Sequence, residues 1–170
     1  ELTARLGGIS YVKKAKASVD VNATVDMDKE LLTLHALDVA VQQLALEGTG
    51  EIGWAGDGTA LDLKLASKKG LPIKALISAV PNAYAADFDG LTASGTFSLA
   101  ATIQGELGPG DDDIPSFSAS ANVQNGAFKY PDLPLGITDL VLDATVKHPG
   151  GNLDKMRIDV PKYGFAAGKS

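Results

Sequence analysis

The stretch from Leu91 to Leu107 alternates strictly between two kinds of side chain. Its odd positions are apolar or small, and its even positions are nearly all polar. A period of two predicts a β-strand with one face toward an apolar environment and one toward water. At roughly 3.3 Å per residue such a strand would span about 55 Å, whereas usual strands have about five or six residues. The chain must therefore form an elongated sheet or bend at glycines, for which Gly95 and Gly105 are the candidates.

The same alternation recurs along most of the chain. It is clearest in residues 16–27, 59–67, 117–125 and 138–147, which are separated mainly by short stretches rich in Gly, Pro, Asn and Asp. One-sided strands joined by short turns indicate about nine to eleven strands in antiparallel order. We therefore predict an all-β fold: one β-rich domain over residues 1–170, built as an elongated, curved antiparallel meander. The sheet either stays open as a groove or folds over as a sandwich filled by its own side chains.

Residues 71–90 break the alternation and predict the one helical insertion, around residues 72–87. Ile73, Leu76, Ile77 and Val80 have helical spacing, and Pro72 suits a first helical turn. The spacing predicts a helix over 72–80, with a further helical turn over 83–88. We expect this helix to pack on the apolar face of the sheet or to close one end of it.

Several turns are predicted from local chemistry. Gly56–Asp57–Gly58 indicates a hairpin, and Asn125–Gly126 indicates a turn between two short strands. Gly48 and Gly50 indicate a break in a strand. Trp54, close to a strand end, is interpreted as a core side chain.

The alternation shifts phase between Val41 and Leu44. One extra residue near Gln42–Gln43 would explain the shift and predicts a β-bulge there. Two separate strands would explain it as well, although no typical turn residue lies between them.

Composition and motifs exclude several functions. The net charge of −6 and the scarcity of basic clusters argue against a nucleic-acid partner. The chain has no cysteine, and its two histidines, His35 and His148, lie in no catalytic motif. The acidic runs 26–30 and 111–113 are interpreted as solvated turns, so we expect no enzyme activity, no cofactor and no metal site.

Two segments carry a family resemblance. The first is ALISAVPNAYAADFDGLTASGTFSLAATIQGEL at residues 75–107. The second is PSFSASANVQNGAFKYPDLPLGITDLVLDATVKHPGGNLDKMRIDV at residues 115–160. A helix ending in Leu-x-x-x-x-Pro before a strand of the type A-S-G-x-F-S-L, and later N-G-x-F-x-Y-P-D-L-P, resembles the AsmA family. The Y-P-D-L-P element at residues 130–134 is the most distinctive part.

This resemblance implies a periplasmic β-rich module of a cell-envelope protein of a double-membraned bacterium. We expect a fragment of a longer protein, held in the inner membrane by an N-terminal anchor outside these residues. The wider superfamily, with TamB, is similar to bridge-like lipid-transfer proteins, which implies lipid transport or outer-membrane biogenesis through a hydrophobic groove. The partners would be lipid acyl chains and other envelope proteins. The groove-lining residues are expected to be Leu91, Phe97, Leu99, Ile103, Val123, Leu140, Leu142 and Val146. The alternative is a scaffold domain that supports assembly of outer-membrane proteins through exposed strand edges.

Overall fold

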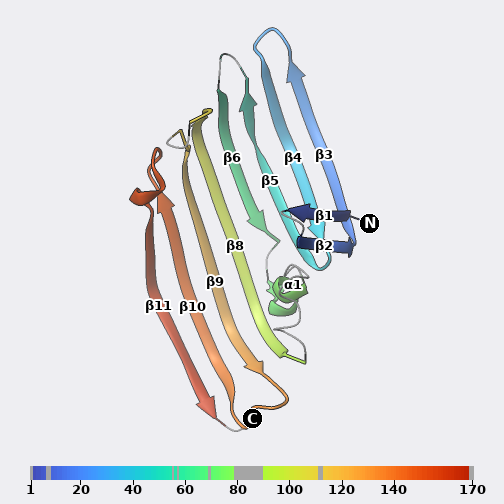
Figure 1. Ribbon diagram of the computed structural model, residues 1–170, viewed down its shortest axis with the longest axis vertical. Coiled ribbons are helices and arrows are strands. Elements are labelled where there is room, and N and C mark those ends of the chain that lie inside the picture. The colour runs from blue at the N-terminus through green and yellow to red at the C-terminus, as the bar shows by residue number, and fades with distance from the viewer. Residues whose placement is uncertain are drawn as a thin grey trace.

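The computed structural model describes residues 2–6, 9–54, 56, 58–68, 70–78, 90–110 and 113–168, with side chains from Lys16 onward within these ranges. Most of the described residues lie in antiparallel β-strands (Figure 1). The strands are β1 Leu2–Leu6, β2 Ile9–Ala15, β3 Ala17–Asp26, β4 Leu31–Val41, β5 Leu44–Gly53, β6 Thr59–Ser67, β7 Leu71–Pro72, β8 Thr92–Leu107, β9 Ser116–Lys129, β10 Gly136–His148 and β11 Arg157–Gly168. One short helix, α1 Ile73–Ser78, and a 3₁₀ turn, Leu153–Lys155, complete the described elements.

The large sheet has nine strands. Its order is β11-β10-β9-β8-β6-β5-β4-β3, with the short β7 paired to β8, and β1 and β2 form a separate hairpin. Neighbours along this path follow one another in sequence apart from β7, so the sheet is a meander. The predicted all-β class, the antiparallel order and the single short helical insertion are confirmed.

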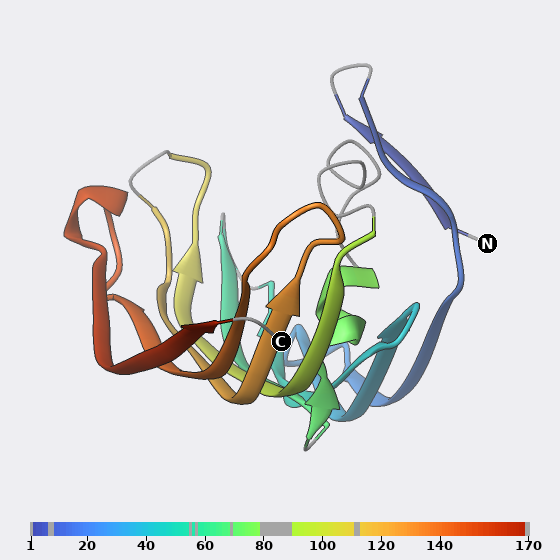
Figure 2. The same ribbon diagram turned by 90° about the horizontal axis from the view of Figure 1, so that it is seen from below.

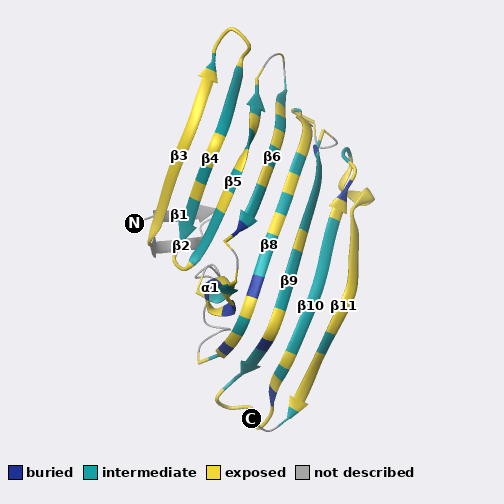
Figure 3. Ribbon diagram, turned by 180° about the vertical axis from the view of Figure 1, so that it is seen from behind, coloured by how far each residue is buried: buried dark blue, intermediate teal, exposed yellow. Residues whose placement is uncertain are grey.

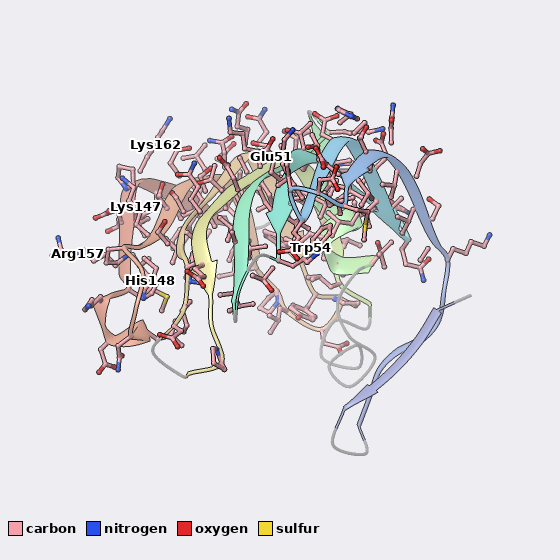
Figure 4. All side chains as sticks on the ribbon, turned by 90° about the horizontal axis from the view of Figure 1, so that it is seen from above. Glu51, Trp54, Lys147, His148, Arg157 and Lys162 are labelled. Carbon is pink, nitrogen blue, oxygen red and sulfur yellow. The ribbon has the colours of Figure 1, made fainter. Side chains whose placement is uncertain are left out.

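The sheet is bent into a U-shaped trough, with β3 and β11 at its two rims (Figure 2). Helix α1 lies inside the trough. Viewed from the other end, Glu51, Lys147 and Lys162 lie on the convex side, whereas Trp54 and His148 lie toward the inside (Figure 4). The curvature therefore gives the two faces of the alternating strands different surroundings.

Helix α1 builds the one compact core of the described chain. Ile73 and Ala75 of α1 pack with Ala93 and Phe97 of β8, and these four side chains are buried. The predicted helix thus exists and packs on the apolar face, with described bounds Ile73–Ser78. The second predicted helical turn, over residues 83–88, lies outside the described residues.

The phase shift after Val41 is a hairpin, so the predicted bulge at Gln42–Gln43 is wrong and the two-strand alternative is correct. Val41 pairs with Leu44, and Gln42 turns the chain with a φ of 56°. The Gln42 N–H donates to the Lys16 carbonyl at 2.8 Å, which ties the turn to the start of β3. Cross-strand pairing imposes this turn although glutamine is not a preferred turn residue.

Asn125–Gly126 does not end a strand. Strand β9 continues through it to Lys129, and the register against both β8 and β10 shifts there. Asn125 has a φ of 50°, and Gly95 on the facing strand has a φ of 100°. The predicted turn is therefore a β-bulge, and the predicted bend at Gly95 lies directly opposite it.

Gly48 and Gly50 do not break a strand either, because β5 runs through both of them. A Cβ at Gly48 would lie 2.6 Å from Leu65 Cδ2, and one at Gly50 would lie 2.1 Å from the Asp62 carbonyl oxygen. The glycines let β6 and its leucines approach β5 closely. Strands β5 and β6 pair antiparallel as the predicted hairpin requires, with Gly53 opposite Ala60, while Asp57 of the predicted turn lies outside the described residues.

Candidate functional site

The apolar positions of all the main strands lie on the concave face of the sheet. Pairing aligns them in rows that cross the trough: Val21, Leu37, Gly48, Leu65 and Ala101 form one row, and Phe97, Val123, Leu142 and Tyr163 form another. Phe97, which packs under α1, belongs to the second row, and this identifies the face as the one that the helix contacts. We call it the apolar face.

Most of the apolar face is neither buried nor filled. Apart from Pro115, the buried apolar side chains among the described residues are Ile73, Ala75, Ala93 and Phe97. The chain exposes 11144 Å² of surface, whereas a compact protein of 17.5 kDa would expose about 7,900 Å². The excess shows that the sheet does not fold over on itself. Of the two predicted arrangements, the open groove is the one observed.

Helix α1 occupies only one part of the trough. The core of four buried residues is formed jointly by α1 and β8, and the partly buried side chains that pack against it are Leu44, Leu71, Ile77, Leu99, Val123 and Phe128. Where β6 ends, Ser67 Oγ accepts a hydrogen bond from the Leu99 N–H at 2.8 Å. This bond satisfies a backbone donor of β8 at the place where its neighbouring strand stops. The rest of the trough, toward the hairpin turns of β3–β4 and β5–β6, has no such cover in the described chain (Figure 1).

The structure brings six of the eight predicted groove residues onto one face. Phe97 pairs with Val123 and Val123 with Leu142, while Leu99, Ile103 and Val146 lie on the same face of their strands. Leu140 is opposite Gly126, at the bulge of β9. Leu91 precedes β8 and is only partly buried.

The prediction that Phe97 lines the groove needs a correction, because its side chain is only 3% exposed. It lies beneath α1 with Ile73 and Ala75 and belongs to the core. Phe97 is therefore not available to line an open groove. The sequence placed it on the correct face but gave no sign that the helix would cover it.

Sequence reasoning overlooked part of the apolar face. Leu61, Leu63 and Leu65 of β6 pair with Gly105, Ile103 and Ala101 of β8, so they line the uncovered part of the trough. Their alternation was visible, and what was lacking was the neighbour relation of β6 to β8. The interpretation of Trp54 as a core side chain is wrong, because Trp54 is 36% exposed and lies outside the buried core.

The convex face is polar and carries ordinary surface electrostatics. Asp38 lies 2.8 Å from Lys68 Nζ, and hydrogen bonding to this carboxylate raises the pKa of Lys68. At the end of β3, hydrogen bonds from Lys29 lower the pKa of the Asp26 carboxyl. Both ion pairs are solvent-exposed and would contribute little to stability.

A surface depression of about 760 Å³ lies where β10 and β11 meet the 3₁₀ turn. Lys147, His148, Asp154 and Arg157 contribute to its lining. His148 is 2% exposed, and its ring stacks on Phe117 with centroids 5.1 Å apart. Its Nε2 is 2.8 Å from the Asn152 carbonyl, and its Nδ1 accepts from the Gly150 N–H at 3.3 Å. Both ring nitrogens are thus engaged by backbone, which identifies His148 as a structural residue rather than a catalytic base.

Replacing His148 with alanine is expected to lower the free energy of unfolding by about 2 kcal/mol, because two backbone groups lose their partner and Phe117 loses its stack. Hydrogen exchange of the 149–156 amides should also become faster. Urea unfolding and exchange mass spectrometry measure both effects. The exposed His35, which bonds only to Thr24, supplies the control: His35→Ala should have a clearly smaller effect, and equal effects would contradict the structural role of His148.

Two further features of the described residues bear on the site. They contain no group of three or more His, Asp or Glu side chains that could hold a metal ion. They also contain no helix long and apolar enough to cross a membrane. The chain was compared with family models, with curated proteins and with solved structures, and it matches none of them.

Proposed function

We propose that the apolar face binds lipid acyl chains and that the protein is a non-enzymatic module of an AsmA-like cell-envelope protein that moves or partitions phospholipid. The observation that carries the proposal is a concave sheet face lined by aliphatic side chains and left open over much of its length. Burying a CH₂ group gains about 0.8 kcal/mol, so an acyl chain needs no polar recognition to be held there. The convex face, with its charged and hydroxyl side chains, would remain in water.

The family resemblance supports the setting of this proposal. The N-G-x-F-x-Y-P-D-L-P element forms the last five residues of β9 and the loop that follows it. In the full-length protein the module would lie on the periplasmic side of the envelope, attached through an inner-membrane anchor. Its partners would be phospholipids and other envelope proteins.

A charge placed on the apolar face is expected to remove bound phospholipid. Ile103 lies on the uncovered part of this face, opposite Leu63 and Phe117. An acyl chain bound over an aspartate at this position would remove water from the carboxylate, which costs free energy. Each 1.4 kcal/mol of this desolvation cost weakens lipid binding about tenfold. The measurement is phospholipid retained per protein, by mass spectrometry, after exposure of the lipid-stripped protein to phosphatidylethanolamine and phosphatidylglycerol vesicles.

Thr102→Asp provides the matched control. Thr102 is adjacent to Ile103 on the same strand, but it faces the exposed convex side. It receives the same charge and should retain lipid, and circular dichroism verifies that both variants fold. A wild-type protein that binds no phospholipid, or equal binding by the two variants, would refute the proposal.

A further inference from the structure

Both ends of the sheet are free edges. Among the described residues, strand β3 pairs only with β4 and β11 only with β10, and the hairpin β1–β2 forms a sheet of its own. Almost every residue of the two edge strands is exposed (Figure 3). Unpaired N–H and C=O groups along a long edge are a template for pairing with another strand.

The topology makes these two edges compatible with each other. The path from β11 to β3 contains eight strands, and each is antiparallel to its neighbours. An even number of alternating strands leaves β3 and β11 running in opposite directions. The β3 of a second copy can therefore lie beside β11 as an antiparallel neighbour, with the apolar faces of both copies on the same side.

The side chains of the two edges match in register as well as in direction. Strand β11 shifts register between Asp159 and Lys162, at Pro161. One bulge at this proline keeps apolar residues opposite apolar residues along both strands. The resulting pairs are Val25 with Ile158, Ala23 with Val160, Val21 with Tyr163, Val19 with Phe165, and Ala17 with Ala167. Aromatic side chains opposite β-branched ones are among the favourable cross-strand pairs.

The convex sides of the edges are opposite in charge. Strand β3 carries Asp20 and Asp26 and no basic residue, whereas β11 carries Arg157 and Lys162 against one acid, Asp159. In the register above, Asp26 is opposite Arg157, and Asp20 is diagonal to Lys162. Asp26 already pairs with Lys29 at 2.9 Å and would then be shared.

Within one copy, Lys162 of the β11 edge lies opposite Asp143 of β10, but Arg157 has no acidic residue opposite it. Arg157 is directly opposite Lys147 on β10, an arrangement of like charges that destabilises a sheet. Among the described side chains neither of them forms a salt bridge. An acidic strand beside β11 would supply the missing negative charge.

We propose that β11 of one copy pairs with β3 of a second copy of this chain, in the register that places Val25 opposite Ile158. The joint continues the apolar face from one copy into the next. Because each copy has one edge of each kind, the contact is heterologous, and two copies can satisfy all their edges by meeting at two such joints.

Cysteine cross-linking tests the register, since the chain has no cysteine of its own. Directly opposite residues of antiparallel strands have Cα atoms about 4.5–5.5 Å apart, within the range that a disulfide spans. A mixture of the Val25→Cys and Ile158→Cys proteins, oxidised together, should form the mixed disulfide-linked dimer. A mixture of Val25→Cys with Phe165→Cys, whose cysteine lies near the other end of β11, should not. Val19→Cys with Phe165→Cys should cross-link again.

Light scattering and charge reversal complete the test. The unmodified chain should shift from 17.5 kDa to at least twice this mass as its concentration rises. Arg157→Glu with Lys162→Glu should abolish the shift, and mixing this variant with the Asp20→Lys, Asp26→Lys variant should restore association. A chain that stays monomeric, or cross-links that form equally in all the mixtures, would overturn the proposal and leave the edges to a different partner or to none.

Discussion

Replacing Phe97 with alanine is expected to lower the free energy of unfolding by about 3–5 kcal/mol, the usual cost of truncating a buried phenylalanine. Phe97 is 3% exposed and is the largest side chain in the cluster with Ile73, Ala75 and Ala93. Domains have about 5–15 kcal/mol of stability in total, so this single change would remove a large share. The effect should be severe because the described chain has only this one buried apolar cluster.

Urea unfolding followed by far-ultraviolet circular dichroism measures this loss. Trp54 is the one tryptophan of the chain and follows the end of β5, whereas Leu44 at the start of β5 packs against the Phe97 cluster. Tryptophan fluorescence therefore reports on the part of the trough away from the helix. If the sheet unfolds as one unit, both probes should shift to the same lower urea midpoint.

Ile103→Ala is the control for Phe97→Ala, since Ile103 lies on the same face of β8 but is only partly buried. It should cost about 1–2 kcal/mol, because less apolar surface returns to water. Equal losses from the two variants would mean that the helix-covered cluster is not the stabilising core. An unchanged fluorescence midpoint in Phe97→Ala would instead restrict its effect to the helix end of the trough.

The sequence was sufficient to assign side chains to faces. A period of two survives in any antiparallel sheet, so Leu99, Ile103 and Leu142 were placed correctly on one face without knowledge of their neighbours. The helix could be located because a spacing of three and four residues differs clearly from a spacing of two. These signals are local, and they hold wherever the strand lies in the sheet.

The openness of the trough could not be predicted in the same way. An open groove and a self-filled sandwich require the same alternation, and they differ in curvature and in what lies above the face. The covering of Phe97 by α1 depends on contacts between segments more than fifteen residues apart in the sequence. Both arrangements are compatible with the alternation, and only the three-dimensional structure separates them.

Local errors arose where pairing overrode turn chemistry. Gln42 adopts a positive φ without being a glycine, because Val41 and Leu44 are held opposite each other. Asn125–Gly126 has the composition of a hairpin turn, but both neighbouring strands extend past it, so it becomes a bulge. In both places the conformation depends on strands distant in the sequence.

The β9 bulge opposite Gly95 leads to the second large expected effect. Gly95→Ala should lower the free energy of unfolding by about 3 kcal/mol or more, since the new side chain meets both a disfavoured φ and a backbone clash. Gly95 has a φ of 100°, and a Cβ there would lie 2.5 Å from the Asn125 carbonyl oxygen and 2.7 Å from Gly126 Cα. Neither atom belongs to a flexible side chain, so β9 itself would have to move. Chemical denaturation measures the loss.

Gly105→Ala separates the two causes. Gly105 lies on the same strand with a φ of 119°, but a Cβ there would meet Pro115 only at 3.6 Å, an ordinary contact. Gly105→Ala should therefore lower the free energy of unfolding only through backbone strain, by about 1–3 kcal/mol. If Gly95→Ala proves no more harmful than Gly105→Ala, close packing of β8 on the β9 bulge is not what requires glycine at position 95. If it is clearly worse, the bulge fixes the alignment of β8 and β9, and with it the row of Phe97, Val123 and Leu142 on the apolar face.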